Sequence, residues 1–183
     1  MVLPGHIAGG YLATTALLSL SHGALTPLES NILLSIGTLA GEGPDIDVLI
    51  FWFMRRQSAE AKKKDGHRDY ITHIPFAWLI GCFVISAVGF AIGSPFIEYL
   101  GAVIFCGAVS HFILDSIEYG IKWLWPFSDR RFCIKTSPQF DMKKEPGSFA
   151  YYAEYVRKFY IKSPTFYVEI LVTALAVFVA LRG

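Results

Sequence analysis

A histidine and an aspartate with helical spacing could bind a metal ion or exchange a proton. His111 and Asp115 are four residues apart at the end of an apolar stretch that begins near Tyr99. Residues four apart lie on one face of a helix, so the imidazole and the carboxylate point together. Glu118 is expected on the same stripe, with the helix ending near Gly120. Ionisable groups in an apolar span usually face the interior of a bundle, where this pair could form a functional site or only fasten two helices together.

A second acidic group follows a proline. Pro44 lacks a backbone N–H and disfavours helix at Gly43, so the apolar segment around it is expected to break or bend there. Asp45 follows the proline directly, and Asp47 comes two residues later. Carboxylates in an apolar span either take up protons or are held ionised by a cation. The pattern predicts a broken helix with a cation site, or a structural turn at the cytoplasmic mouth.

Two further histidines flank the entry to the next apolar stretch. His67 and His73 are six residues apart and do not share a helix face, so at least one lies on a loop. Arg68 and Thr72 lie between them and could contact an anionic substrate. His6 precedes the first apolar stretch. His22, by contrast, falls in a predicted outer loop and is expected to have no role in a site.

The composition and charge pattern predict an integral membrane protein. Hydrophobic residues make up 54% of the chain and charged residues 17%. All lysines and arginines except Arg182 fall in two segments, 55–68 and 122–162. The positive-inside rule makes these segments cytoplasmic, which places the N-terminus inside and a short turn at 93–95 outside. The apolar stretches run over residues 7–20, 31–54, 74–97, 99–114 and 170–181.

These stretches predict an all-α bundle of about four to five transmembrane helices with a broken second helix. Only 74–97 is comfortably long enough to span the bilayer without including ionisable residues. The chain is expected to form one domain over residues 1–183, with basic cytoplasmic loops at about 55–73 and 120–163. Apolar residues recur at helical spacing over 149–162, which predicts an amphipathic helix in the headgroup layer, or a soluble lid.

The predicted topology gathers the chemically active residues. The candidates expected in the cytoplasmic half of the bundle are His6, Asp45, Asp47, His67, His73, His111 and Asp115. Such a set suits zinc or another divalent transition metal, and its size allows one or two ions. The 3 cysteines form no CxxC pair, so a thiolate site or a disulfide is not expected. The basic loops also carry acids, which favours contact with membrane lipid over nucleic acid.

These motifs, taken in order, resemble those of the YdjM-like inner-membrane proteins, which are described as membrane-bound metal-dependent hydrolases. The resemblance covers roughly the first two-thirds of the chain. It rests on His6, Pro44-Asp45-Ile46-Asp47, His67-Arg68 with Thr72-His73, His111 with Asp115, and then Gly120 and Trp125-Pro126-Phe127. The family is distantly similar to zinc-dependent phospholipase C and P1-type nucleases, which implies phosphoester hydrolysis. This chain departs from the pattern at Val48, Ile74 and Glu118, where the family often has His, Ser and Thr.

The sequence therefore predicts an inner-membrane hydrolase that acts on a phosphoester or ester of a membrane-associated, lipid-like substrate through a metal-activated water. Asp47 would be a bridging ligand or the base that accepts the water proton, and Arg68 would stabilise the developing charge. A non-catalytic, metal-stapled scaffold or regulator that binds a partner through its basic loops is the first alternative. A transporter is the second, although the sequence has no repeat or paired broken helices.

Overall fold

The computed structural model describes residues 3–48, 70–136 and 149–182, and this part of the chain is helical without a named strand. His67 and Arg68, together with the basic segment around them, lie outside the described residues. The predicted all-α fold is confirmed. The α-helices are α1 (Leu3–Leu18), α2 (Pro27–Ala40), α4 (Pro75–Ala91), α5 (Pro95–Asp115), α6 (Phe149–Lys158) and α7 (Pro164–Arg182). The short 3₁₀ turns are η1 (Gly43–Asp45), η4 (Ile71–His73) and η5 (Tyr160–Lys162).

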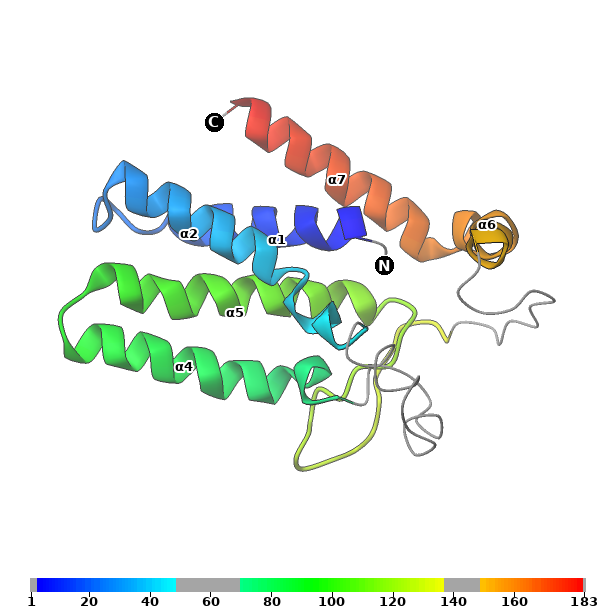
Figure 1. Ribbon diagram of the computed structural model, residues 1–183, viewed down its shortest axis with the longest axis horizontal. Helices are drawn as coiled ribbons and strands as arrows, with labels where there is room; N and C mark the ends of the chain where they lie inside the picture. Colours follow the sequence, from blue (N-terminus) through cyan, green and yellow to red (C-terminus); the bar gives the residue numbers. More distant parts are fainter. Residues whose placement is uncertain (1–2, 49–69, 137–148, 183) are drawn as a thin grey trace.

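Helix α5 is the centre of the bundle. It packs against α4, α2 and α1, while α7 reaches the bundle through α1. Figure 1 shows α4 and α5 as an antiparallel pair, with α1 and α2 on one side of α5, α7 crossing obliquely beyond α1, and α6 away from the four-helix group. The turns η1 and η4 contact each other at one end of α4 and α5. The elements that carry the predicted site residues therefore meet at one end of the bundle.

Two of the described helices are long and apolar enough to cross a membrane. They are α5, with 21 residues, and α7, with 19 residues, and α4 is an apolar helix of 17 residues. At about 1.5 Å per residue, α5 is about 31 Å long, close to the thickness of the hydrocarbon core. Helices α1 and α2 have 16 and 14 residues. The structure thus has fewer full-length spans than the four to five predicted, within the same class of helical membrane protein.

The predicted break in the second helix is present. Helix α2 ends at Ala40, and Pro44 is in the first turn of η1, after which residues 46–48 are again helical. Proline fits the first turn of a helix, where its missing N–H would have no intrahelical partner. The interruption turns the chain so that Asp45 and Asp47 leave the line of α2.

The end of α5 differs from the prediction. The helix stops at Asp115, not near Gly120: the backbone N–H groups of Ile117 and Glu118 donate to carbonyls three residues back, and the chain then turns. Glu118 therefore leaves the stripe of His111 and accepts a hydrogen bond from Thr165 Oγ1 in α7. This carboxylate ties the end of α5 to α7 and takes no part in the predicted histidine–aspartate face.

The predicted amphipathic segment forms α6, which is followed by η5. Its last turn carries Arg157 and Lys158, and Lys158 pairs with Glu154 one turn earlier. The helix thus has the charged face that the sequence indicated. Its location in the headgroup layer stays a prediction.

Close packing between α2 and α5 depends on Gly107. A Cβ atom at this position would lie 2.2 Å from the carbonyl oxygen of Gly37 and 2.9 Å from Ala40 Cβ. We expect Gly107→Ala to force the two helices apart and to lower the free energy of unfolding by about 1–3 kcal/mol. Chemical denaturation in detergent would measure the loss. Gly81→Ala is the matched control, since a Cβ there meets no atom within 4 Å, and equal stability of the two variants would contradict this account.

Candidate metal centre

Three histidines surround the carboxylate of Asp115. His6 Nε2 lies 3.4 Å from Asp115 Oδ1, and the Nε2 atoms of His73 and His111 lie 3.5 and 3.8 Å from Asp115 Oδ2. All four side chains are buried, with at most 1% of their surface exposed. Helices α1 and α5 and the turn η4 thus direct three imidazole nitrogens at one carboxylate.

Asp45 adds a carboxylate at the edge of this group. Its Oδ1 atom lies 3.7 Å from His111 Nε2, and 25% of its side chain is exposed. Two sets of three potential ligand atoms result, with the atoms of each set within 4.8 Å of one another. The sets are His6, His111 and Asp115, and Asp45, His73 and His111. Because His111 belongs to both, the residues could hold one metal ion or two neighbouring ions.

Small residues allow the main chain of α1 to approach the end of α2. A Cβ at Gly41 would lie 2.4 Å from the carbonyl oxygen of His6, and a Cβ at Gly10 would lie 2.7 Å from the carbonyl oxygen of Thr38. The imidazole of His6 stacks on that of His111, with ring centroids 3.8 Å apart and planes inclined by 20°. The glycines therefore let the start of α1, which carries His6, lie against the end of α2.

Two of the histidines are oriented through the ring nitrogen that faces away from Asp115. His111 Nδ1 is 2.8 Å from the carbonyl oxygen of Gly41, an acceptor only, so Nδ1–H donates and Nε2 carries the lone pair. His73 Nδ1 lies 2.7 Å from Asp47 Oδ2, which also accepts from Thr72 Oγ1 at 2.8 Å. A second hydrogen bond of this kind fixes the tautomer and ring angle of metal-binding histidines.

The buried histidine nitrogens that lack hydrogen-bond partners are consistent with a cation site. Within the described residues, His111 Nε2 and both ring nitrogens of His6 are buried without a hydrogen-bond partner. Buried polar atoms are nearly always satisfied, and leaving one unsatisfied costs about 1–3 kcal/mol. A divalent ion beside Asp115 would satisfy His111 Nε2 and one ring nitrogen of His6, the Nε2 atom that faces Asp115. These buried histidines and aspartates could therefore hold a metal ion.

The structure brings together five of the seven predicted ligands: His6, Asp45, His73, His111 and Asp115. Asp47 lies behind the imidazole of His73, on the side away from Asp115. His67 lies outside the described residues, as does Arg68, the predicted charge-stabilising residue. His22, which was expected to have no role, is exposed in the loop after α1.

Sequence reasoning missed Glu42 as a site residue. Its carboxylate is half-buried, and the charges of Asp45 and Asp115 are close enough to act on it. One of its oxygens, Oε1, is buried without a hydrogen-bond partner in the part of the chain that the structure describes. Its place in the interrupted segment, three residues before Asp45, was the available signal.

Glu169 joins α7 to the start of α1. It is buried in α7 and accepts a hydrogen bond from the backbone N–H of Gly5 at 3.1 Å. A carboxylate at the first turn of a helix satisfies an N–H that lacks an intrahelical partner and complements the helix dipole. Glu169 thus fixes the start of α1, next to His6, from a neighbouring helix.

The apolar helices and the buried histidine–aspartate group define a helical membrane protein with a potential metal centre. Sequence comparison places the chain more narrowly, because the family model for the YdjM inner membrane protein matches residues 1–182. The chain belongs to the YdjM inner membrane protein family.

A curated relative supports the same location. The chain is 32% identical over 116 residues to the inner membrane protein YbcI of Escherichia coli (strain K12), and the match covers 58% of this chain and 63% of YbcI. It therefore spans less than two thirds of that relative. No solved structure matches the chain. The family and the relative identify the inner membrane as the location of this protein.

Proposed function

We propose that the protein is a membrane-bound, metal-dependent hydrolase that cleaves a phosphoester or ester bond of a membrane-associated substrate. The observation that carries the proposal is the convergence of three imidazole nitrogens on buried Asp115, with Asp45 at a partly exposed edge. A site with fixed ligands and an open side is typical of catalytic metal centres. The exposed edge at Asp45 is where water and substrate would enter.

Zinc is the metal that we propose, as one or two ions. Imidazole nitrogens and carboxylate oxygens are ligands that zinc accepts, and the two overlapping sets could each hold one ion. When bound, zinc would polarise the scissile group and lower the pKa of a water molecule toward neutrality. His6, Asp45, His73, His111 and Asp115 would hold it, and His67 stays a further proposed ligand.

Asp47 acts in this proposal as a positioning residue, and no longer as the bridging ligand or base that the sequence favoured. Its Oδ2 atom accepts from His73 Nδ1 and from Thr72 Oγ1, which directs His73 Nε2 at Asp115. In hydrolysis, the water oxygen bonds to phosphorus or to the carbonyl carbon, the ester bond breaks, and the leaving alcohol takes up a proton. Arg68 would steady the negative charge that develops in this step.

The proposed site faces the cytoplasm. This orientation rests on the positive-inside rule, which places the basic segments 55–68 and 122–162 inside together with the N-terminus. The site is at the end of the bundle where α1 begins and α5 ends. The basic residues nearby would favour an anionic, phosphate-containing substrate and the headgroups of membrane lipids.

A non-catalytic scaffold or regulator is the alternative, in which metal staples the bundle and the basic loops bind a partner. One observation favours it. The potential ligands come from α1, η1, η4 and α5, and four of the five are at most 1% exposed, so a bound ion would join four separate elements. A scaffold of this kind would bind metal and be stabilised by it without hydrolysing any phosphoester.

Chelation distinguishes the two functions. We expect the zinc-loaded protein in detergent to hydrolyse bis(p-nitrophenyl) phosphate, a soluble phosphodiester probe. It should hydrolyse the corresponding phosphomonoester or carboxylic ester at a rate that differs from that of the diester according to its specificity. Removal of zinc with a chelator should abolish the activity, and added zinc should restore it. Bound zinc without turnover of any of these probes would reject the hydrolase and support the scaffold.

A further inference from the structure

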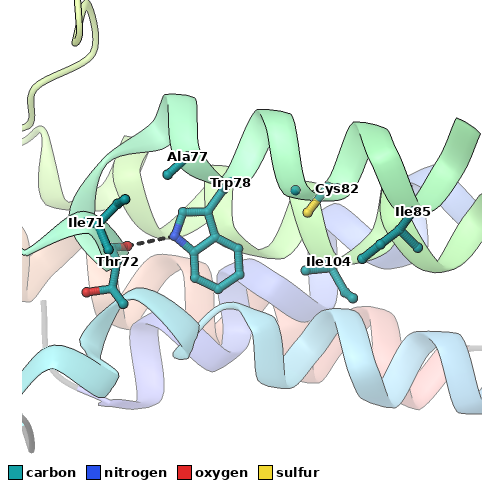
Figure 2. Close-up of a pocket in the computed structure, with 8 residues that line it drawn as sticks. Ile71, Thr72, Ala77, Trp78, Cys82, Ile85 and Ile104 are labelled. Atoms are coloured by element: carbon teal, nitrogen blue, oxygen red, sulfur yellow. Dashed lines mark hydrogen bonds between the residues drawn. The ribbon is translucent and has the colours of Figure 1, made fainter.

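An apolar groove runs from the candidate metal centre along the first half of α4. It has a volume of about 370 Å³ and is lined by Ile71, Thr72, Ala77, Trp78, Gly81, Cys82, Ile85 and Ile104. This volume lies within the range of small-molecule sites, about 300–1,000 Å³. Figure 2 shows Thr72 at one end, the Trp78 indole beside it, Cys82 and Ile85 farther along α4, and Ile104, which comes from α5, near them.

The groove and the metal centre share one wall. Thr72 lines the groove and donates its hydroxyl hydrogen bond to Asp47, which holds His73. Trp78 Nε1 donates to the Thr72 carbonyl at 2.7 Å, and a Cβ at Gly43 would lie 2.7 Å from the Trp78 ring, so the indole packs against the turn that carries Asp45. A molecule in the groove would therefore have one end beside the potential ligands.

The length of the groove is comparable to the hydrocarbon part of one bilayer leaflet. Its lining on α4 runs from Ala77 to Ile85, a rise of about 12 Å. One leaflet contributes about half of the 30 Å hydrocarbon core. In the proposed orientation, the turn η4, which carries His73, would lie at the headgroup end of this path, and Ile85 would lie near the middle of the span. An acyl chain of a lipid in that leaflet would lie along the groove.

We propose that the groove binds an acyl chain of a phospholipid and thereby presents the ester or phosphoester next to the headgroup to the metal centre. This inference rests on the proposed function and names its substrate class, a phospholipid of the leaflet on the side of the centre. The apolar walls bury the chain, and Thr72 marks the boundary at which the polar part of the lipid begins. The groove selects substrates by the chain, while the centre acts on the ester.

Photo-crosslinking tests the acyl site without requiring catalysis. The probe is a phosphatidylglycerol with a diazirine in its acyl chain, at low content in phosphatidylcholine nanodiscs that hold the full-length, metal-depleted protein. We expect adducts to concentrate on α4 between Trp78 and Ile85 and on Ile104, above the level on the exposed apolar face of α7 around Leu171 and Leu175.

Gly81→Leu is the blocking variant, because Gly81 lines the groove and a Cβ at this position meets no atom within 4 Å, which leaves room for a side chain to enter the groove. Leucine is also a better helix former than glycine, which preserves α4. We expect groove labelling to fall about tenfold, the scale of a steric change in an apolar pocket. Ala87→Leu, at an exposed position of α4 outside the groove, should leave labelling unchanged.

Two results would overturn the inference. One is groove labelling no stronger than that of α7, and the other is equal labelling of the wild type and Gly81→Leu. Because the protein is depleted of metal, neither result depends on hydrolysis. Zinc-dependent turnover without groove labelling would therefore reject the acyl site alone, and groove labelling without turnover would reject the hydrolase alone.

Discussion

His111→Ala is expected to remove most of the metal affinity of the protein. His111 supplies an atom to both sets of potential ligands, and its Nδ1 hydrogen bond to Gly41 directs Nε2 into the centre. Structural zinc sites with four ligands contribute about 10–16 kcal/mol, so one ligand accounts for about 3 kcal/mol, or roughly two orders of magnitude in the dissociation constant. Competition with a zinc chelator of known affinity would measure the change.

The control for this variant is His22→Ala, which removes an exposed imidazole from the loop after α1. It should bind zinc as the wild type does. Retention of wild-type zinc affinity by His111→Ala would exclude His111 as a ligand. The proximity of His111 to Asp115 would then be only a packing contact within α5. Loss of affinity in both variants would instead indicate adventitious binding to surface histidines.

Asp47→Asn is expected to weaken metal binding by about 10–100-fold while preserving the fold. The substitution keeps the shape of the side chain but removes the charge that His73 Nδ1 and Thr72 Oγ1 face. The His73 ring would then be less basic and less firmly held toward Asp115. Cobalt substitution provides a spectroscopic measurement, since the intensity and position of its visible bands report how the ligands are arranged.

Thr72→Val is the matched control for Asp47→Asn. It removes the hydroxyl donor but leaves Asp47 and its contact with His73 in place, so the cobalt spectrum should change less. If Asp47→Asn instead lowered zinc affinity as much as His111→Ala, Asp47 would be a direct ligand. If Asp47→Asn had the wild-type cobalt spectrum and the wild-type metal affinity, Asp47 would not position His73 either.

The sequence predicted those features that depend on local spacing. The apolar stretches became α1, α2, α4, α5 and α7. Pro44 broke the second stretch because the loss of a backbone donor acts wherever the chain is placed in space. The spacing of four residues between His111 and Asp115 placed both side chains on one face of α5, where His111 Nε2 lies 3.8 Å from Asp115 Oδ2.

The features that were missed depend on contacts between distant segments. Asp47 and His73 are 26 residues apart, and their hydrogen bond is formed only when η1 meets η4. The helix end at Asp115 is likewise determined by the loop that follows it. Ser116 bonds back to Phe112 and also accepts from Trp123 Nε1 at 2.8 Å, which draws the chain away from the helix axis. Periodicity carries no information about such contacts.

The metal content of the protein, purified in detergent without chelators and after incubation with zinc, tests the central claim most directly. Mass spectrometry of the metals should find about one or two zinc equivalents per chain in the wild type, a loss of most of this zinc in His111→Ala/Asp115→Ala, and wild-type content in His22→Ala. No metal above background in the wild type, even after reconstitution, would contradict the account and leave the buried histidines and aspartates as contacts that fasten the helices together.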